Sequence, residues 1–148
     1  MFGLRFPIRL GSRARADWSW NRWFGDRGER AAAKFLRRKG MRILCRSYRT
    51  PRGEIDLVAR DGGTLVFVEV KTRRQGQPAE AVNLEKQRRI TRASLQFLKR
   101  YGLLDLARPV PCRFDIVAVV WPEERGRPTI EHFPDAFDAA GPSGQFFS

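Results

Sequence analysis

Two acidic side chains and one lysine occur at a spacing that fits metal chemistry. The segment around them resembles two strands joined by Gly62-Gly63, a dipeptide that favours a two-residue hairpin loop. In that register Asp56 faces Glu69 across the hairpin, whereas a three-residue loop beginning at Asp61 would turn Asp56 to the other face. Opposed carboxylates repel one another, and a bound divalent cation would offset the repulsion. Such a site could activate water and polarise a phosphodiester, with Lys71 stabilising negative charge on the phosphate.

A purely structural interpretation of the same residues is the alternative. The two-residue loop places Glu54 opposite Lys71, so a cross-strand ion pair with two solvated acids nearby would also satisfy the charges. However, Glu69 and Lys71 interrupt a run of apolar residues that begins at Leu65, where Thr or Val would cost less free energy. We therefore favour the metal site.

The charge of the chain indicates a polyanionic partner. The 148 residues include 29 Lys and Arg against 16 Asp and Glu, which gives a formal net charge of +13. The acidic segment that contains Asp56 and Glu69 lies between two basic segments. Carboxylates on a surface that only held phosphates would repel the ligand, so a metal ion explains their position better. Nucleic acid is the expected partner.

Length and composition are typical of one globular domain. No apolar run approaches the roughly 20 residues that a membrane-spanning helix needs, which argues against an integral membrane protein. The two cysteines, Cys45 and Cys112, form no CxxC pair, and this usage indicates a reducing, cytoplasmic compartment.

The expected domain covers residues 21–137, between a basic arm and a tail. Residues 1–20 contain four arginines and a single acid, Asp17. They fit a flexible basic arm, a mitochondrial transit peptide, a membrane-surface segment or a disordered tail, and we leave their role open. Residues 138–148 contain glycine, proline and serine and are expected to form a flexible C-terminal tail.

A first helix is predicted from Asn21 to Lys39, where apolar residues recur at helical spacing before Gly40. Glu29 projects from the edge of its apolar stripe. From the residues alone, the preferred interpretation of this carboxylate is an ion pair with a basic neighbour such as Arg30.

A second helix is predicted from Asn83, its N-cap, to Tyr101, with basic side chains around an apolar stripe. A solvated charged face is one interpretation. We favour contact with phosphates instead, because basic residues greatly outnumber acidic ones in this helix. Two more basic residues, Arg73 and Arg74, end the preceding strand. The residues expected to contact nucleic acid are Arg73, Arg74, Lys86, Arg88, Arg89 and Arg92.

Two further strands complete the expected fold: an edge strand at residues 43–48 and a later strand at residues 113–121. With the hairpin and the two helices, they predict an α/β domain in which a mixed sheet is flanked by helices.

These residues carry a family resemblance. The stretches GEIDL (residues 53–57) and FVEVKTR (residues 67–73) resemble the D...(D/E)xK core of the PD-(D/E)XK nuclease superfamily. Over residues 21–137 the chain resembles the YraN family of bacterial proteins, which are similar to archaeal Holliday junction resolvases. Gly28-Glu29 in the first helix and Arg113-Phe114-Asp115 in the later strand are part of this resemblance.

The resemblance implies a restriction-endonuclease-like fold and a divalent-metal endodeoxyribonuclease, a hydrolase of phosphodiester bonds in DNA, including branched or junction DNA. By position, Asp56, Glu69 and Lys71 would be catalytic, and Glu29 would join the two acids in binding Mg²⁺ or Mn²⁺. Analogy with junction resolvases suggests a homodimer. Two other functions stay open: a nucleic-acid-binding module with little or no catalysis, and a basic protein of an assembly such as the ribosome.

Three more residues have expected roles. Asp115 would support the site through hydrogen bonds or be purely structural. The single histidine, His132, lies in a short apolar run and is expected to be structural. Ser47 stands where YraN relatives usually carry Asn, so the resemblance is weaker in the loop before Gly53.

Overall fold

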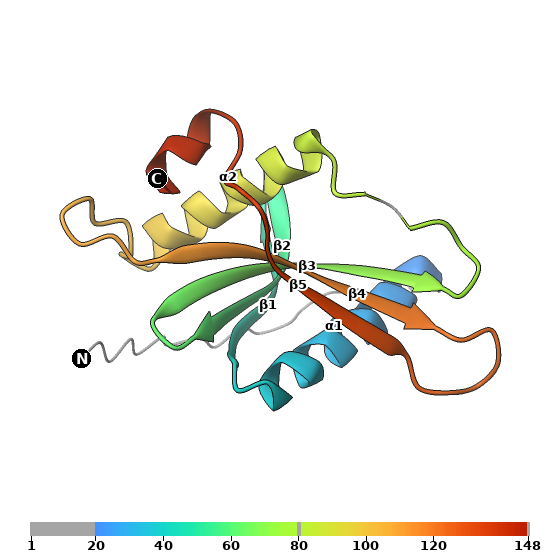
Figure 1. The fold of residues 1–148 in the computed structure, drawn as a ribbon. Coiled ribbons are helices and arrows are strands. Elements are labelled where there is room, and N and C mark those ends of the chain that lie inside the picture. Colours follow the sequence, from blue (N-terminus) through green and yellow to red (C-terminus); the bar gives the residue numbers. More distant parts are fainter. Residues whose placement is uncertain (1–19, 80, 148) are drawn as a thin grey trace.

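One mixed five-stranded sheet with a helix on each face forms the molecule (Figure 1). The structure is a computed structural model that describes residues 20–79 and 81–147, so the predicted arm lies outside the described residues except for Trp20. The α/β class is confirmed, in an arrangement consistent with a restriction-endonuclease-like fold. The elements are α1 (Trp20–Arg38), β1 (Arg42–Thr50), β2 (Gly53–Asp61), β3 (Thr64–Arg74), α2 (Leu84–Arg100), β4 (Cys112–Trp121), β5 (Thr129–Phe137) and the 3₁₀-helix η1 (Pro142–Phe147).

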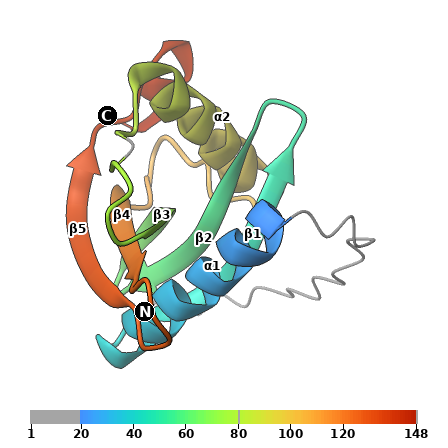
Figure 2. The same cartoon turned by 90° about the vertical axis from the view of Figure 1, so that its right-hand side faces the viewer.

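The strands lie in the order of the sequence, from β1 at one edge to β5 at the other. All neighbours are antiparallel except β3 and β4, which are parallel. A parallel pair needs a long crossover, and α2 supplies it between β3 and β4. This crossover places α2 over one face of the sheet, while α1 covers the other (Figure 2).

Each helix buries its apolar stripe in a core of its own. On the α2 face, Phe97 packs edge to face on Phe67, with ring centroids 5.9 Å apart. On the α1 face, Leu36 packs in the cluster that contains Val68 and Val117. The sheet therefore has few solvent-facing positions in its middle strands, and a charged side chain there needs a specific reason.

The predicted helix boundaries hold to within one residue. The Asn83 side chain caps α2 by accepting a hydrogen bond of 2.9 Å from the backbone N–H of Lys86. Gly40 and Gly102 follow the two helices with φ of 94° and 65°, a conformation that glycine adopts at little cost.

The C-terminal residues differ from the flexible tail predicted for residues 138–148. Phe147 in η1 lies 5.4 Å from Phe114, measured between ring centroids, and packs against the α2-side core. The end of the described chain thus covers apolar surface, a role that its glycine and serine content does not suggest.

No helix in the described part of the chain combines the length and the apolarity needed to cross a membrane.

Candidate functional site

The hairpin of β2 and β3 has the predicted register over its closed end. Asp61 pairs with Thr64 and Leu57 pairs with Val68, which makes Gly62-Gly63 the two-residue loop. Regular pairing extends no further than Leu57. Beyond it, β2 stays paired with β1, while β3 points away towards the other side of the molecule (Figure 1).

This divergence corrects one prediction, the pairing of Glu54 with Lys71. Glu54 instead pairs with Arg49 of β1, and its carboxylate lies 3.6 Å from the Arg49 guanidinium. The alternative explanation, in which a cross-strand ion pair of Glu54 and Lys71 accounts for the acids, therefore loses its central contact.

Asp56 stands at the point where the two strands part. Its Oδ2 accepts a hydrogen bond of 2.8 Å from the backbone N–H of Val70 in β3. The carboxylate thus satisfies a β3 donor beyond the last regular pair. Its negative charge also acts on Glu69, although both residues lie beyond the last regular pair of the hairpin.

In the β1–β2 hairpin, the side chains change from one face of the sheet to the other at the same point. Ile55 and Leu57 would share a face in a regular strand, yet Ile55 packs in the α2-side core and Leu57 in the α1-side core. In β1, Ser47 has a left-handed φ of 52°. Ser47 lies between the residues that pair with Ile55 and Leu57, so it stands opposite Asp56. Side chains from both helices therefore act on Asp56: Glu29 from α1 and Lys86 from α2.

Glu69 is the most buried acid of the site, with a relative exposure of 3%. Its Oε1 lies 3.2 Å from Lys86 Nζ and 3.9 Å from Lys71 Nζ. Its Oε2 is buried without a hydrogen-bond partner among the described residues. Burial, and then the charge of Asp56, raise the pKa of Glu69 to about 8, although Lys86 opposes the shift.

Glu29 reaches the site from α1. Ser47 Oγ donates a hydrogen bond of 2.9 Å to Glu29 Oε2. Burial raises the pKa of Glu29 to about 7, with the negative charge of Asp56 as the next cause. Arg30, the partner expected from the residues alone, pairs with Asp26 at 3.1 Å instead. Glu29 therefore lies near Asp56, and its role as a metal ligand stays a prediction.

Lys86 is the residue whose position the sequence did not reveal. It was expected to contact nucleic acid from an exposed face of α2, but its ammonium group lies against Glu69. Burial disfavours that ammonium ion, but the charge of Glu69, its hydrogen bond and the charges of Asp56 and Glu54 together outweigh burial and raise the pKa of Lys86. A signal was present, since Lys86 precedes Ile90 by four residues and so extends the buried stripe of α2 by one turn.

The donor chemistry of the three carboxylates fits a hard divalent cation. Oxygen ligands suit Mg²⁺ and Mn²⁺, and the unpartnered Oε2 of Glu69 is a buried acceptor with nothing to accept. Within residues 20–79 and 81–147, however, no three acidic, histidine or cysteine side chains are grouped as ready ligands for an ion. Cation binding would therefore require these side chains to rotate towards one another.

Two glycines let the helices approach the site closely. A Cβ on Gly28 would lie 1.9 Å from Thr72 Oγ1, so α1 rests directly on β3 beside Glu29. A Cβ on Gly53 would lie 2.5 Å from the backbone oxygen of Arg89, so the β1–β2 turn rests directly on α2. Close packing at these two positions explains why glycine occupies them.

Replacing Gly28 by Ala should destabilise the protein, while Gly25→Ala in the same helix should not. At Gly28 the added methyl meets the Thr72 side chain, and overpacking of this kind costs about 1–3 kcal/mol. At Gly25 nothing lies within 4 Å, so the better helix former should add up to about 1 kcal/mol. Urea unfolding of both variants measures the difference, and equal stabilities would show that α1 does not rest on β3 at Gly28.

Asp115 belongs to a separate polar network. The fully buried carboxylate accepts hydrogen bonds from Arg113 Nε at 2.8 Å and from the backbone N–H of Asp135 at 2.9 Å, and its Oδ2 lies 2.8 Å from His132 Nε2. These partners belong to β4 and β5. The arrangement is that of a structural network, which agrees with the structural role expected for His132.

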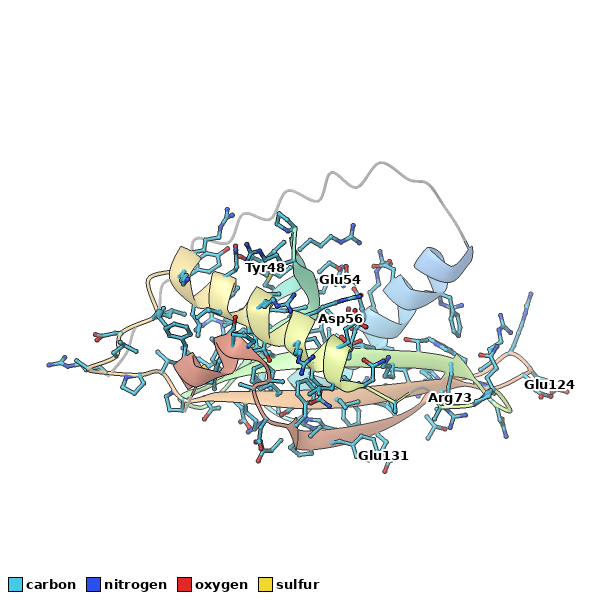
Figure 3. The ribbon with its side chains drawn as sticks, turned by 90° about the horizontal axis from the view of Figure 1, so that it is seen from above. Tyr48, Glu54, Asp56, Arg73, Glu124 and Glu131 are labelled. Carbon is cyan, nitrogen blue, oxygen red and sulfur yellow. The ribbon has the colours of Figure 1, made fainter. Side chains whose placement is uncertain are left out.

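The other basic residues predicted to contact nucleic acid fall into two groups. In α2, Arg88 and Arg89 are exposed and Arg92 is half-buried. At the end of β3, Arg73 donates a hydrogen bond of 2.8 Å to the backbone oxygen of Gln77, and the Arg74 guanidinium lies over the Phe24 ring. Figure 3 shows Arg73 near the turn that carries Glu124, apart from Asp56. Of the α2 cations, Lys86 contacts Glu69 and Arg89 lies with Lys86 and Glu54 around one pocket, whereas Arg88 lies beside Gly141.

Comparison of the sequence with known proteins identifies a family and many similar proteins. Residues 28–119 match the model of the uncharacterised protein family UPF0102, a range that includes all the acidic residues of the site. A UPF0102 protein of Rhodopirellula baltica is 50% identical over 127 residues, covering 82% of this chain and 74% of the relative. A UPF0102 protein of Symbiobacterium thermophilum is 49% identical over 122 residues, covering 80% of this chain and 99% of the relative.

Proposed function

The chain belongs to UPF0102, the YraN family, and from that premise we propose that it is a metal-dependent endonuclease that binds DNA and hydrolyses phosphodiester bonds. One observation carries the proposal: Asp56 of β2 lies close enough to Glu29 of α1 and to Glu69 of β3 to raise the pKa of both, and a buried oxygen of Glu69 has no partner among the described residues. A purely structural strand would gain nothing from that arrangement.

Asp56, Glu69 and Glu29 would hold Mg²⁺ or Mn²⁺. When bound, the cation supplies Lewis acidity towards the phosphodiester and lowers the pKa of a water molecule. Asp56 is already oriented by the Val70 N–H, and Glu29 by the Ser47 hydroxyl. These hydrogen bonds hold both carboxylates close to one another, and rotation of the side chains would complete the ligand set.

Lys71 has the geometry of a group that neutralises phosphate charge. Its ammonium lies 3.9 Å from Glu69 Oε1, and its side chain is 26% exposed. An ammonium group at the border between a buried acid and solvent can contact an incoming phosphate and stabilise the negative charge that develops during hydrolysis.

The DNA-binding part of the proposal rests on the basic surface of α2, with Arg88, Arg89 and Arg92 as phosphate contacts. The cations at the end of β3, Arg73 and Arg74, would contact a more distant part of the strand. A homodimer, suggested by analogy with junction resolvases, would present two such sites to two strands.

A second function, a nucleic-acid-binding module without catalysis, is favoured by one observation. Lys86 already supplies a positive charge at Glu69, 3.2 Å from its Oε1. A site neutralised in this way could keep its fold and its basic surface without a metal ion.

A cleavage assay separates the two functions. The full chain is incubated with linear, flapped, single-stranded and four-way DNA in Mg²⁺, Mn²⁺ or EDTA, and binding to the same DNA is measured in EDTA. The nuclease proposal expects cleavage of at least one DNA form that requires the metal. Salt-dependent DNA binding without cleavage of any DNA form would exclude the nuclease and support the nucleic-acid-binding module. Absence of both binding and cleavage would exclude both functions.

A further inference from the structure

A polar pocket opens beside the carboxylates, between the β1–β2 turn and the first turns of α2. Its volume is about 270 Å³, and it is lined by Arg49, Thr50, Gly53, Glu54, Lys86 and Arg89. Three of these side chains are cationic and one is anionic. Figure 3 shows Glu54 and Asp56 close together beside α2, so the pocket and the carboxylate site are neighbours.

The walls of the pocket are held in place by the backbone. Thr50 Oγ1 accepts hydrogen bonds from the N–H groups of Arg52 at 3.2 Å and Gly53 at 3.1 Å, and donates one of 2.9 Å to the Gly53 oxygen. The absent Cβ of Gly53 lets this turn rest on the backbone of Arg89. Arg49 and Arg89 therefore line one space from the side of the turn and from the side of α2.

The arginines of the pocket are available to an anion. The side chain of Arg49 is 56% exposed and pairs with Glu54 at 3.6 Å, and that of Arg89 is 54% exposed and pairs with Glu85. Exposed pairs of this kind contribute about 0–1 kcal/mol, so a phosphate can replace them at little cost. Arginine binds phosphate through two parallel hydrogen bonds, a stronger interaction than a solvated ion pair.

Lys86 connects the pocket to the carboxylate site, because it lines the pocket while its ammonium group contacts Glu69. A strand whose phosphate lies at Glu69 would bring a neighbouring phosphate towards this space. The alternative occupant, a free carboxylate or nucleotide, would leave the basic surface of α2 without a role.

We propose that this pocket binds one backbone phosphate of the DNA strand, next to the phosphate at the carboxylate site, and that Arg49 and Arg89 share it. The proposal rests on the function proposed above and adds to it a defined position for the strand, across the β1–β2 turn and the start of α2.

A double-mutant cycle in DNA affinity tests the shared phosphate. Affinity of the full chain for fluorescein-labelled DNA is measured in EDTA from 50 to 200 mM salt for Arg49→Ala, Arg89→Ala and the double variant. One phosphate contact contributes a slope of about 0.9 in log affinity against log salt, which is about 3.5-fold over this range. Each single variant should lose that slope, and the double variant should lose no more than either single variant.

Arg88→Ala is the matched control. Arg88 immediately precedes Arg89 in α2 and carries the same charge, but its side chain packs beside Gly141 on another flank of the helix. Its effect should add to that of Arg49→Ala. Additive effects of Arg49→Ala and Arg89→Ala, or no effect of Arg89→Ala, would overturn the pocket while leaving DNA binding intact. Absence of salt-dependent DNA binding by the parent protein would overturn the proposed function and the pocket together.

Discussion

Asp56→Asn and Glu69→Gln should each lower the rate of metal-dependent DNA cleavage by at least about 100-fold. Groups that only orient a metal ligand are worth about 10–100-fold, so removal of a ligand itself should cost more. Both substitutions keep the shape of the side chain, remove its capacity to carry a negative charge and replace one acceptor oxygen by an NH₂ group. The measurement is the single-turnover rate of the full chain on the DNA form that the parent protein cleaves best.

DNA binding in EDTA should survive both substitutions, because neither adds a negative charge beside the proposed phosphate position. Glu124→Gln is the matched control, since it makes the same chemical change in an exposed turn remote from Asp56 (Figure 3). It should cleave at the parent rate. Cleavage by Glu69→Gln at that rate would place the catalytic centre elsewhere.

Glu69→Gln should stabilise the metal-free protein at pH 8 and have little effect at pH 5. The pKa of Glu69 is raised from its ordinary 4.5 to about 8, so the folded state binds more protons than the unfolded state between these values. Its stability therefore falls as the pH rises through this window. One pKa unit is worth about 1.4 kcal/mol, so a gain of a few kcal/mol is expected at pH 8, and urea unfolding at both pH values measures it.

The control for this prediction is the same substitution at pH 5, where Glu69 is already protonated in the folded state. A loss of stability at pH 8 would contradict the expectation, because the ion pair of Glu69 with Lys86 would then outweigh burial and the charge of Asp56.

The register of the hairpin could be predicted because local chemistry sets it. Gly62-Gly63 favours a two-residue loop, and that loop fixes which residues face each other near it. The end of the pairing could not be predicted. At that point Asp56 accepts a hydrogen bond from the Val70 N–H, and Ser47 in the neighbouring strand has a left-handed φ. Neither feature changes the spacing of apolar residues in the sequence.

The helices were located by periodicity, but their contacts with the site required the fold. Nothing in the spacing of α1 shows that Gly28 lies against Thr72, since the two residues are distant in sequence. Glu29 accordingly looked like a surface acid from its neighbours alone. Lys86 was misplaced for a different reason, because charge was given more weight than its position on the buried stripe of α2.

The central claim is that Asp56, Glu69 and Glu29 together hold a divalent cation. The most direct measurement is the melting temperature of the full chain at pH 8 during a titration with Mn²⁺, in parallel with Glu69→Gln. A ligand that binds only the folded state stabilises it by about 2.7 kcal/mol at 100 times its Kd. The parent protein should melt at rising temperature as Mn²⁺ is added, and Glu69→Gln should not respond. A parent protein that ignores Mn²⁺, or a variant that responds equally, would contradict the account.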